Sequence, residues 1–139
     1  MSLKKVETGR APEAIGPYSQ GMLCPDDCVP FEISGQLPIK PGEKNLIVGD
    51  MDAMTHRSLQ NLAGILEAAG GKVQDLAKVR VYLTDMDQFE HMNGAYGVFM
   101  EGHSPARACV EVSGLPMGAP IEIEAVAYIP KENIPPRYR

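Results

Sequence analysis

Residues 105–128 read PARACVEVSGLPMGAPIEIEAVAY, and they contain the two segments that determine the fold class. In each segment apolar and polar side chains alternate, which is the pattern of a half-buried β-strand. We expect one strand over Ala106–Val112 and another over Ile121–Tyr128. The short connection between them favours an antiparallel pair.

Alternation gives each of these strands one polar face. Arg107, Cys109 and Glu111 share a face of the first strand, and Glu122 and Glu124 share a face of the second. This pattern fits a solvated outer surface with cross-strand ion pairs, because one-sided burial is ordinary for antiparallel sheets. It also fits a site in which an arginine binds a carboxylate and a glutamate moves a proton. The periodicity leaves both interpretations open.

Upstream of these strands, two segments with apolar residues at helical spacing predict helices. The first runs from Met51 to Ala69, with Asp50 as its N-cap and Gly70-Gly71 after its end. The second is capped by Asp85 or Asp87 and runs to about Met100. Its apolar stripe consists of Phe89, Met92, Tyr96, Phe99 and Met100.

Three more strands are expected, around Val6, over Phe31–Ser34 and over Ala77–Leu83. Helices that cross between strands predict an α+β fold, in which a mixed β-sheet carries the two helices packed on one face. The second face of the sheet must then be solvated or buried against another subunit.

The composition is that of an ordinary globular chain, with 139 residues, 44% hydrophobic and 22% charged. This length predicts a single domain over residues 1–139. No apolar run approaches the roughly 18 residues that cross a membrane, and the first residues have no signal-peptide core. We therefore expect a cytoplasmic protein, or a mitochondrial one if a leader has been removed.

The net charge and the absence of known motifs argue against several classes of function. A net charge of −5 disfavours nucleic-acid binding, which is driven by neutralising phosphates with basic residues. The three cysteines (Cys24, Cys28 and Cys109) and the isolated histidines do not have zinc-site spacing, so no metal is expected. No Gly-x-Ser-x-Gly or Gly-x-Gly-x-x-Gly motif supports a serine hydrolase or a dinucleotide site.

Motifs in order along nearly the whole chain resemble the RidA/YjgF/YER057c/UK114 family, which includes the L-PSP endoribonucleases. They are AIGPYSQG (14–21), ISGQLP (33–38), PARACVEV (105–112), LP (115–116) and IEIEAVA (121–127). The segments RSLQNL (57–62) and EAAG (67–70) look like the family's first helix, and Asn93-x-x-Tyr96-x-x-Phe99 looks like its second.

The resemblance implies a chorismate-mutase-like fold assembled as a homotrimer, with clefts between the subunits. It implies a 2-iminobutanoate/2-iminopropanoate deaminase, which hydrolyses reactive enamines and imines from pyridoxal-phosphate enzymes. The products would be 2-keto acids and ammonia, and no cofactor would be used. The expected partners are therefore the small imine or keto acid and further copies of the chain, with neither nucleic acid nor membrane.

The resemblance also implies roles for single residues. Arg107 would hold the substrate carboxylate and Glu122 would activate water, so these two are the expected catalytic residues. The expected substrate-binding residues are Tyr18, Ser34, Gly35, Asn93, Arg107 and Cys109. Cys109 would face the ligand through its backbone more than through its thiol. We do not expect it to be a nucleophile, because no neighbouring histidine in the sequence could activate the thiol.

One segment departs from the family pattern. The chain between Tyr18 and Ser34 is longer than the family's and contains Cys24-Pro25-Asp26-Asp27-Cys28. We expect this segment near the rim of the cleft, where it bears on substrate size. Two other functions remain open: an endoribonuclease or translation inhibitor, and a non-catalytic trimeric module that binds a small ligand.

Overall fold

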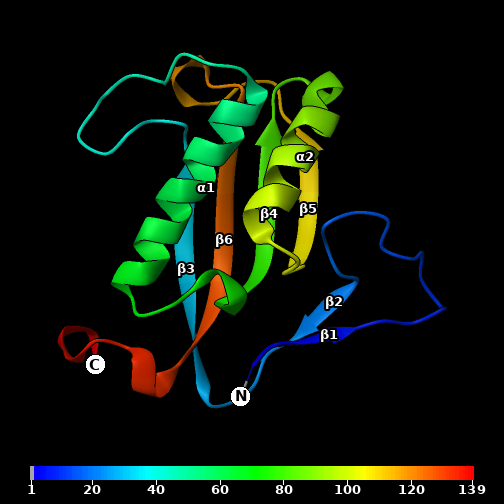
Figure 1. Cartoon of the computed structure of the whole chain (residues 1–139), viewed down its shortest axis with the longest axis vertical. Coiled ribbons are helices and arrows are strands. Elements are labelled where there is room, and N and C mark those ends of the chain that lie inside the picture. The colour runs from blue at the N-terminus through cyan, green and yellow to red at the C-terminus, as the bar shows by residue number, and fades with distance from the viewer. Residues whose placement is uncertain (1) are drawn as a thin grey trace.

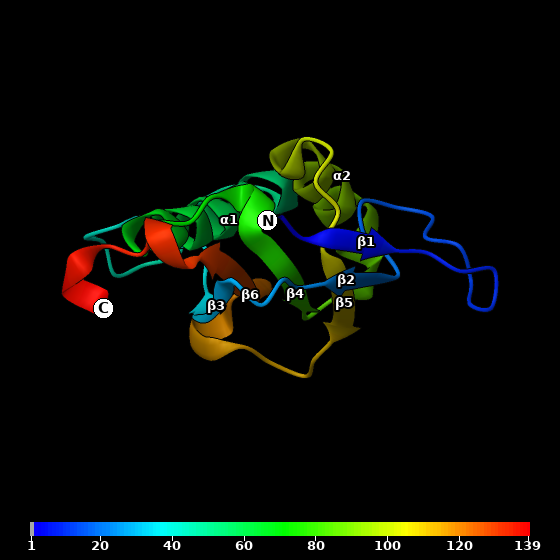
Figure 2. The same ribbon diagram turned by 90° about the horizontal axis from the view of Figure 1, so that it is seen from below.

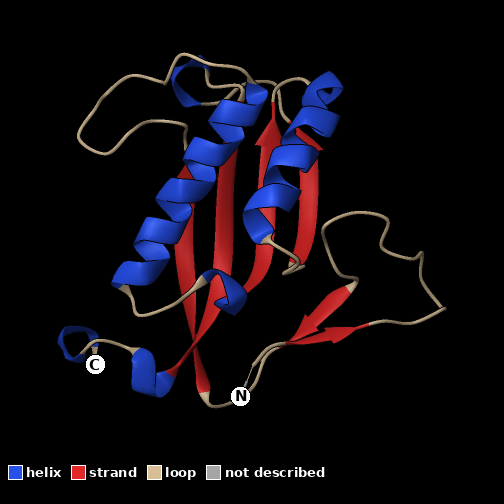
Figure 3. Cartoon of the chain, viewed as in Figure 1, coloured by secondary structure: helices blue, strands red, loops and turns tan. Residues whose placement is uncertain are grey.

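The computed structural model describes residues 2–139, in which two helices cover one face of a mixed β-sheet (Figures 1 and 3). The sheet has four strands in the order β3-β6-β4-β5. The α+β prediction is therefore confirmed. The bounds of these elements are β3 Cys28–Gln36, α1 Met51–Ala68, β4 Leu76–Leu83, α2 Phe89–Met100, β5 Ala106–Glu111 and β6 Ile121–Pro130.

The pairing predicted for the last two strands is wrong. β5 pairs with β4 in parallel, whereas β6 lies between β3 and β4 and runs antiparallel to both. The reason is the crossover: α2 returns the chain to the same end of the sheet, so β5 runs parallel to β4. The connection after β5 then passes the end of β4, where the Thr84 amide donates to the Pro120 carbonyl. The short connection from β5 to β6 therefore crosses β4, which lies between these two strands in the sheet.

Helix α1 begins and ends where the sequence predicts. The Asp50 carboxylate accepts a hydrogen bond from the Ala53 amide at 2.9 Å, which satisfies one of the free N–H groups of the first turn. After the helix, Gly70 has a φ of +88°, a backbone conformation that favours glycine. Helix α2 begins later than predicted, because Asp85 caps a separate 3-10 turn over Met86–Gln88.

The hydrophobic core lies between the two helices and the sheet, and Figure 2 shows both helices on the same side. Along β6 every second residue from Ile121 to Ile129 is buried against the helices, while Glu122 and Glu124 point to the opposite, helix-free face. Leu59, Leu62 and Leu66 of α1 are fully buried against this layer. We call the opposite side of the sheet the open face.

Two short strands, β1 (Lys4–Val6) and β2 (Gly21–Leu23), form a separate antiparallel pair beside the sheet. The loop between them, residues 7–20, extends outward in Figure 1. It returns to the sheet at Ser19, which forms an isolated bridge with Ala106 at the start of β5. No helix within residues 2–139 is long and apolar enough to span a membrane.

Candidate functional site

Arg107 is a half-buried cation surrounded by aromatic rings. Its guanidinium carbon lies 4.8 Å from the ring centroid of Tyr96, 5.3 Å from that of Tyr18 and 5.8 Å from that of Phe89. Its Nη1 donates to Asn93 Oδ1 at 2.7 Å. No aspartate or glutamate oxygen of the described chain lies within 4.0 Å of this guanidinium. The charge is oriented but not neutralised, which suits a group that binds an anion.

Three elements supply this arrangement. Phe89, Asn93 and Tyr96 are spaced i, i+4 and i+7 on α2, so they share the helix face that packs on β5. Tyr18 comes from the 7–20 loop and is fixed because the Ser19 amide donates to the Pro105 carbonyl at 3.3 Å. The side chain of Arg107 therefore lies under α2, on the covered face of the sheet.

Cys109 lies two residues beyond Arg107 on the same face of β5. Burial raises the pKa of its thiol, and the positive charge of Arg107 offsets only part of that rise. The thiol is therefore protonated near neutral pH and a poor nucleophile. Tyr96 is fully buried, burial raises its pKa, and its hydroxyl has no hydrogen-bond partner among residues 2–139.

Glu122 lies in a different place, in a pocket of about 380 Å³ on the open face. Gly35, Tyr82, Leu115 and Glu124 complete the lining. A Cβ atom at position 35 would stand 2.2 Å from Glu122 Oε2, so any other residue there requires the Glu122 side chain to move from this position. Within the described chain, Glu122 accepts no hydrogen bond and has no ion-pair partner.

The residues expected at one site thus form two groups on opposite faces of the sheet. Arg107 is in register with Val79, which is in register with Ala125, and both of these neighbours face the helices. Glu122 is in register with Tyr82 on the open face. Tyr18, Asn93 and Cys109 gather around Arg107, whereas Gly35 contacts Glu122. Ser34 precedes Gly35 on β3 and is exposed.

This placement separates the two polar faces that alternation predicts. The face that carries Arg107 and Cys109 is covered by α2 and is not a solvated surface, while the face of Glu122 and Glu124 is free of helices. Within one chain, Arg107 and Glu122 do not meet.

A family model described as Endoribonuclease L-PSP matches residues 8–129. The chain belongs to the endoribonuclease L-PSP family. One relative, a 2-iminobutanoate/2-iminopropanoate deaminase of Salmonella typhimurium, is 41% identical over 127 residues, or 89% of this chain and 96% of that protein. A RutC family protein of Pyrococcus horikoshii is 45% identical over 121 residues, or 87% of this chain and 94% of that protein.

Solved structures agree with the family assignment. The crystal structure of E. coli TdcF with bound serine matches with a TM-score of 0.66 at 39% identity, over 90% of this chain and 98% of that one. The crystal structure of yeast Mmf1 matches with a TM-score of 0.70 at 33% identity, over 92% and 99% of the two chains.

Four residues near the candidate site of this L-PSP chain were not expected there. The α2 stripe predicts Phe89 and Tyr96 as core residues, and periodicity gives no sign that their rings also face a guanidinium. Tyr82 and Glu124 line the pocket of Glu122. Alternation already places Glu124 on the face of Glu122. Tyr82 could have been found only from the correct strand order, because it reaches this pocket through the pairing of β4 with β6.

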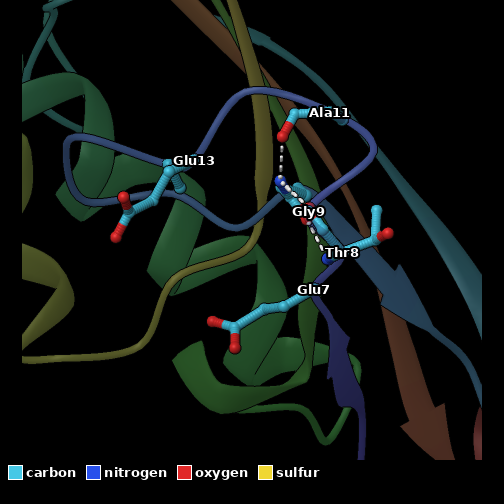
Figure 4. Close-up of a pocket in the computed structure, with 7 residues that line it drawn as sticks. Glu7, Thr8, Gly9, Ala11 and Glu13 are labelled. Carbon is cyan, nitrogen blue, oxygen red and sulfur yellow. Dashed lines mark hydrogen bonds between the residues drawn. The ribbon is translucent and has the colours of Figure 1, made fainter.

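The L-PSP chain has another hollow, formed by the 7–20 loop (Figure 4). Its shape is held by Gln20, whose amide nitrogen donates to the carbonyls of Thr8, Ala11 and Pro12, while its oxygen accepts from the Thr8 amide. None of the expected site residues lines it. Among residues 2–139 no group of three or more His, Cys, Asp or Glu side chains is placed to bind a metal ion.

Proposed function

We propose that this chain hydrolyses small 2-imino acids, such as 2-iminobutanoate and 2-iminopropanoate, to 2-keto acids and ammonia. One observation supports the proposal most: Arg107 is held by Asn93 and three aromatic rings and has no carboxylate partner in the described chain. A 2-imino acid presents a carboxylate, which the planar guanidinium can bind with two parallel hydrogen bonds.

The active site we propose is shared between copies of the chain in a homotrimer. Arg107 and Glu122 are on opposite faces of one sheet, so one copy cannot bring both groups to the same small substrate. The open face has no helices over it, and Val110 there is 46% exposed. A second copy placed on this face would cover it. The second copy would also bring its own Arg107 group to the edge of the face that carries Glu122. We also infer one domain over residues 1–139, since the family match runs from residue 8 to residue 129.

In this mechanism each group has a separate role. Arg107 binds the substrate carboxylate, and Glu122 of the adjoining copy takes a proton from water as the new C–O bond forms at the imine carbon. Glu122 passes that proton to the imine nitrogen, which gives a carbinolamine with a hydroxyl and an amino group on the same carbon. The hydroxyl proton then moves to the amino nitrogen as the C–N bond breaks, so ammonia leaves and the 2-keto acid remains. Cys109 lines the site without reacting, because its thiol is protonated. This hydrolysis requires no cofactor, since positioning and charge suffice for an imine that already reacts with water.

The test is hydrolysis of 2-iminobutanoate, generated by an amino-acid oxidase with semicarbazide competing for the imine. Arg107→Ala should lower kcat/KM at least about a hundredfold, because the carboxylate loses a bidentate partner. Arg137→Ala is the matched control, since Arg137 stacks on the exposed Tyr138 at the C-terminus. Full activity in Arg107→Ala would contradict the site assignment.

A second candidate is ribonuclease activity, which the family description favours. The net charge of −5 opposes it, because RNA binding depends on phosphate neutralisation. Incubating labelled RNA with the wild type and with Arg107→Ala shows whether the chain cleaves RNA and whether cleavage depends on the proposed imine site. If both proteins cleave RNA equally, ribonuclease activity resides elsewhere on the chain. If neither cleaves RNA, that candidate is eliminated.

A further inference from the structure

The pocket of Glu122 contains a second carboxylate, Glu124, and the two differ in their hydrogen bonding. Glu124 Oε1 accepts a hydrogen bond from the Tyr82 hydroxyl. Glu122 accepts none within residues 2–139. Both side chains are half-buried and line the same hollow. One carboxylate is therefore fixed by a neutral donor and the other is free to contact water or substrate.

The Tyr82 hydroxyl bonds to a glutamate other than the one that strand pairing places opposite it. Tyr82 is directly opposite Glu122 in the register of β4 with β6, whereas Arg80 is opposite Glu124. The Tyr82 hydroxyl nevertheless bonds diagonally to Glu124. The hydrogen bond and partial burial raise the pKa of Tyr82, so its hydroxyl remains a donor at neutral pH. Arg80 is exposed and has no carboxylate within 4.0 Å in the described chain, so Tyr82 is the group that holds Glu124.

We propose that Tyr82 is a positioning residue that keeps the Glu124 carboxylate away from the substrate and leaves Glu122 as the single free carboxylate of the pocket. This inference rests on the proposed function, because it concerns a substrate that is itself an anion. A mobile second carboxylate beside such a substrate repels it and competes with it for the guanidinium. Tyr82 prevents both effects and does not take part in the chemistry.

Removing the hydroxyl should weaken substrate binding and leave the chemical step intact. For Tyr82→Phe we expect KM to rise roughly three- to tenfold with kcat within about twofold of wild type, since Glu122 is unchanged. In Tyr82→Phe/Glu124→Gln the freed group is neutral, and KM should return to the wild-type value. Tyr128→Phe is the matched control, because Tyr128 is on the same face of β6 but outside the pocket.

The affinity for 2-oxobutanoate, measured by titration calorimetry, separates this inference from the proposed function. If the wild type binds the keto acid but does not hydrolyse imines, the proposed reaction is wrong. The inference is still supported in that case if Tyr82→Phe binds the keto acid more weakly and the double variant binds it as the wild type does. An unchanged KM and affinity in Tyr82→Phe would overturn it, as would a loss confined to kcat. A wild type that neither hydrolyses nor binds would overturn both.

If Tyr82→Phe failed to assemble, Glu124→Gln alone would provide the test. Removing the charge of Glu124 should not raise KM, and a raised KM would show that Glu124 itself assists the substrate, contrary to the proposal.

Discussion

Arg107 shows how one side chain can be positioned without being neutralised. Asn93 fixes its direction, and the rings of Tyr18, Phe89 and Tyr96 contact the guanidinium while offering no formal charge. A carboxylate partner in the same chain would compete with any anionic ligand. This environment also determines the state of Cys109, where burial outweighs the opposing effect of the nearby cation.

The Cys109 thiol should react slowly with iodoacetamide at pH 7. Burial raises its pKa above the ordinary value of 9.0, so only a small fraction is thiolate at pH 7 and half of the thiol is ionised only above pH 9.0. Mass spectrometry of digested protein between pH 7 and pH 10 measures this rate for each cysteine. Arg107→Ala should slow the reaction further, because Arg107 lowers the thiol pKa. Rapid labelling of Cys109 at pH 7 would instead indicate a stabilised thiolate.

At the scale of elements, the sequence predicts helix ends, which depend on a few neighbouring residues. It does not predict which strands pair in the sheet. Asp50 and Gly70 mark the ends of α1 because capping and positive φ are properties of a few neighbouring residues. Helix α2 begins later than the sequence predicts, since Asp85 can cap a 3-10 turn as well as an α-helix. The antiparallel pairing predicted for β5 and β6 is wrong because alternation in these strands does not specify which strand lies between them. The same error hid the opposite placement of Arg107 and Glu122.

Capping by Asp50 can be tested as a property of α1. Asp50→Ala should lower the free energy of unfolding by about 1 kcal/mol, because the Ala53 amide loses its acceptor. Asp87→Ala is the matched control: Asp87 is exposed and begins no α-helix. Urea unfolding of both variants at one protein concentration measures the difference. An equal effect of the two substitutions would rule out capping as the cause.

At the scale of the whole molecule, the two faces of the sheet carry the two groups of residues from which we propose a shared site. Three copies would bring the Arg107 group of one copy to the Glu122 group of another, which is the arrangement of the proposed trimer. The resemblance to a family implies this arrangement, whereas the periodicity of one chain carries no information about contacts between copies.

A mixing experiment tests the shared site directly. Arg107→Ala and Glu122→Gln should each be inactive alone. When the two are unfolded and refolded together, random assembly should restore about a quarter of the wild-type activity, because one interface in four combines both intact groups. Each variant refolded separately is the control. No recovery in verified mixed trimers would contradict a site that combines Arg107 of one copy with Glu122 of another.

The central position of β6 has a consequence for synthesis on the ribosome. β6 hydrogen-bonds to both β3 and β4, although it is the last strand to be made. Until it emerges, β3 has no neighbour within the four-stranded sheet and the leucines of α1 lack the side chains of β6 that they pack against. We expect a nascent chain ending at residue 120 to be protease-sensitive throughout, and the complete chain to become resistant in one step after release. Limited proteolysis of stalled nascent chains would show whether this growing polypeptide needs protection by chaperones until its final strand is in place.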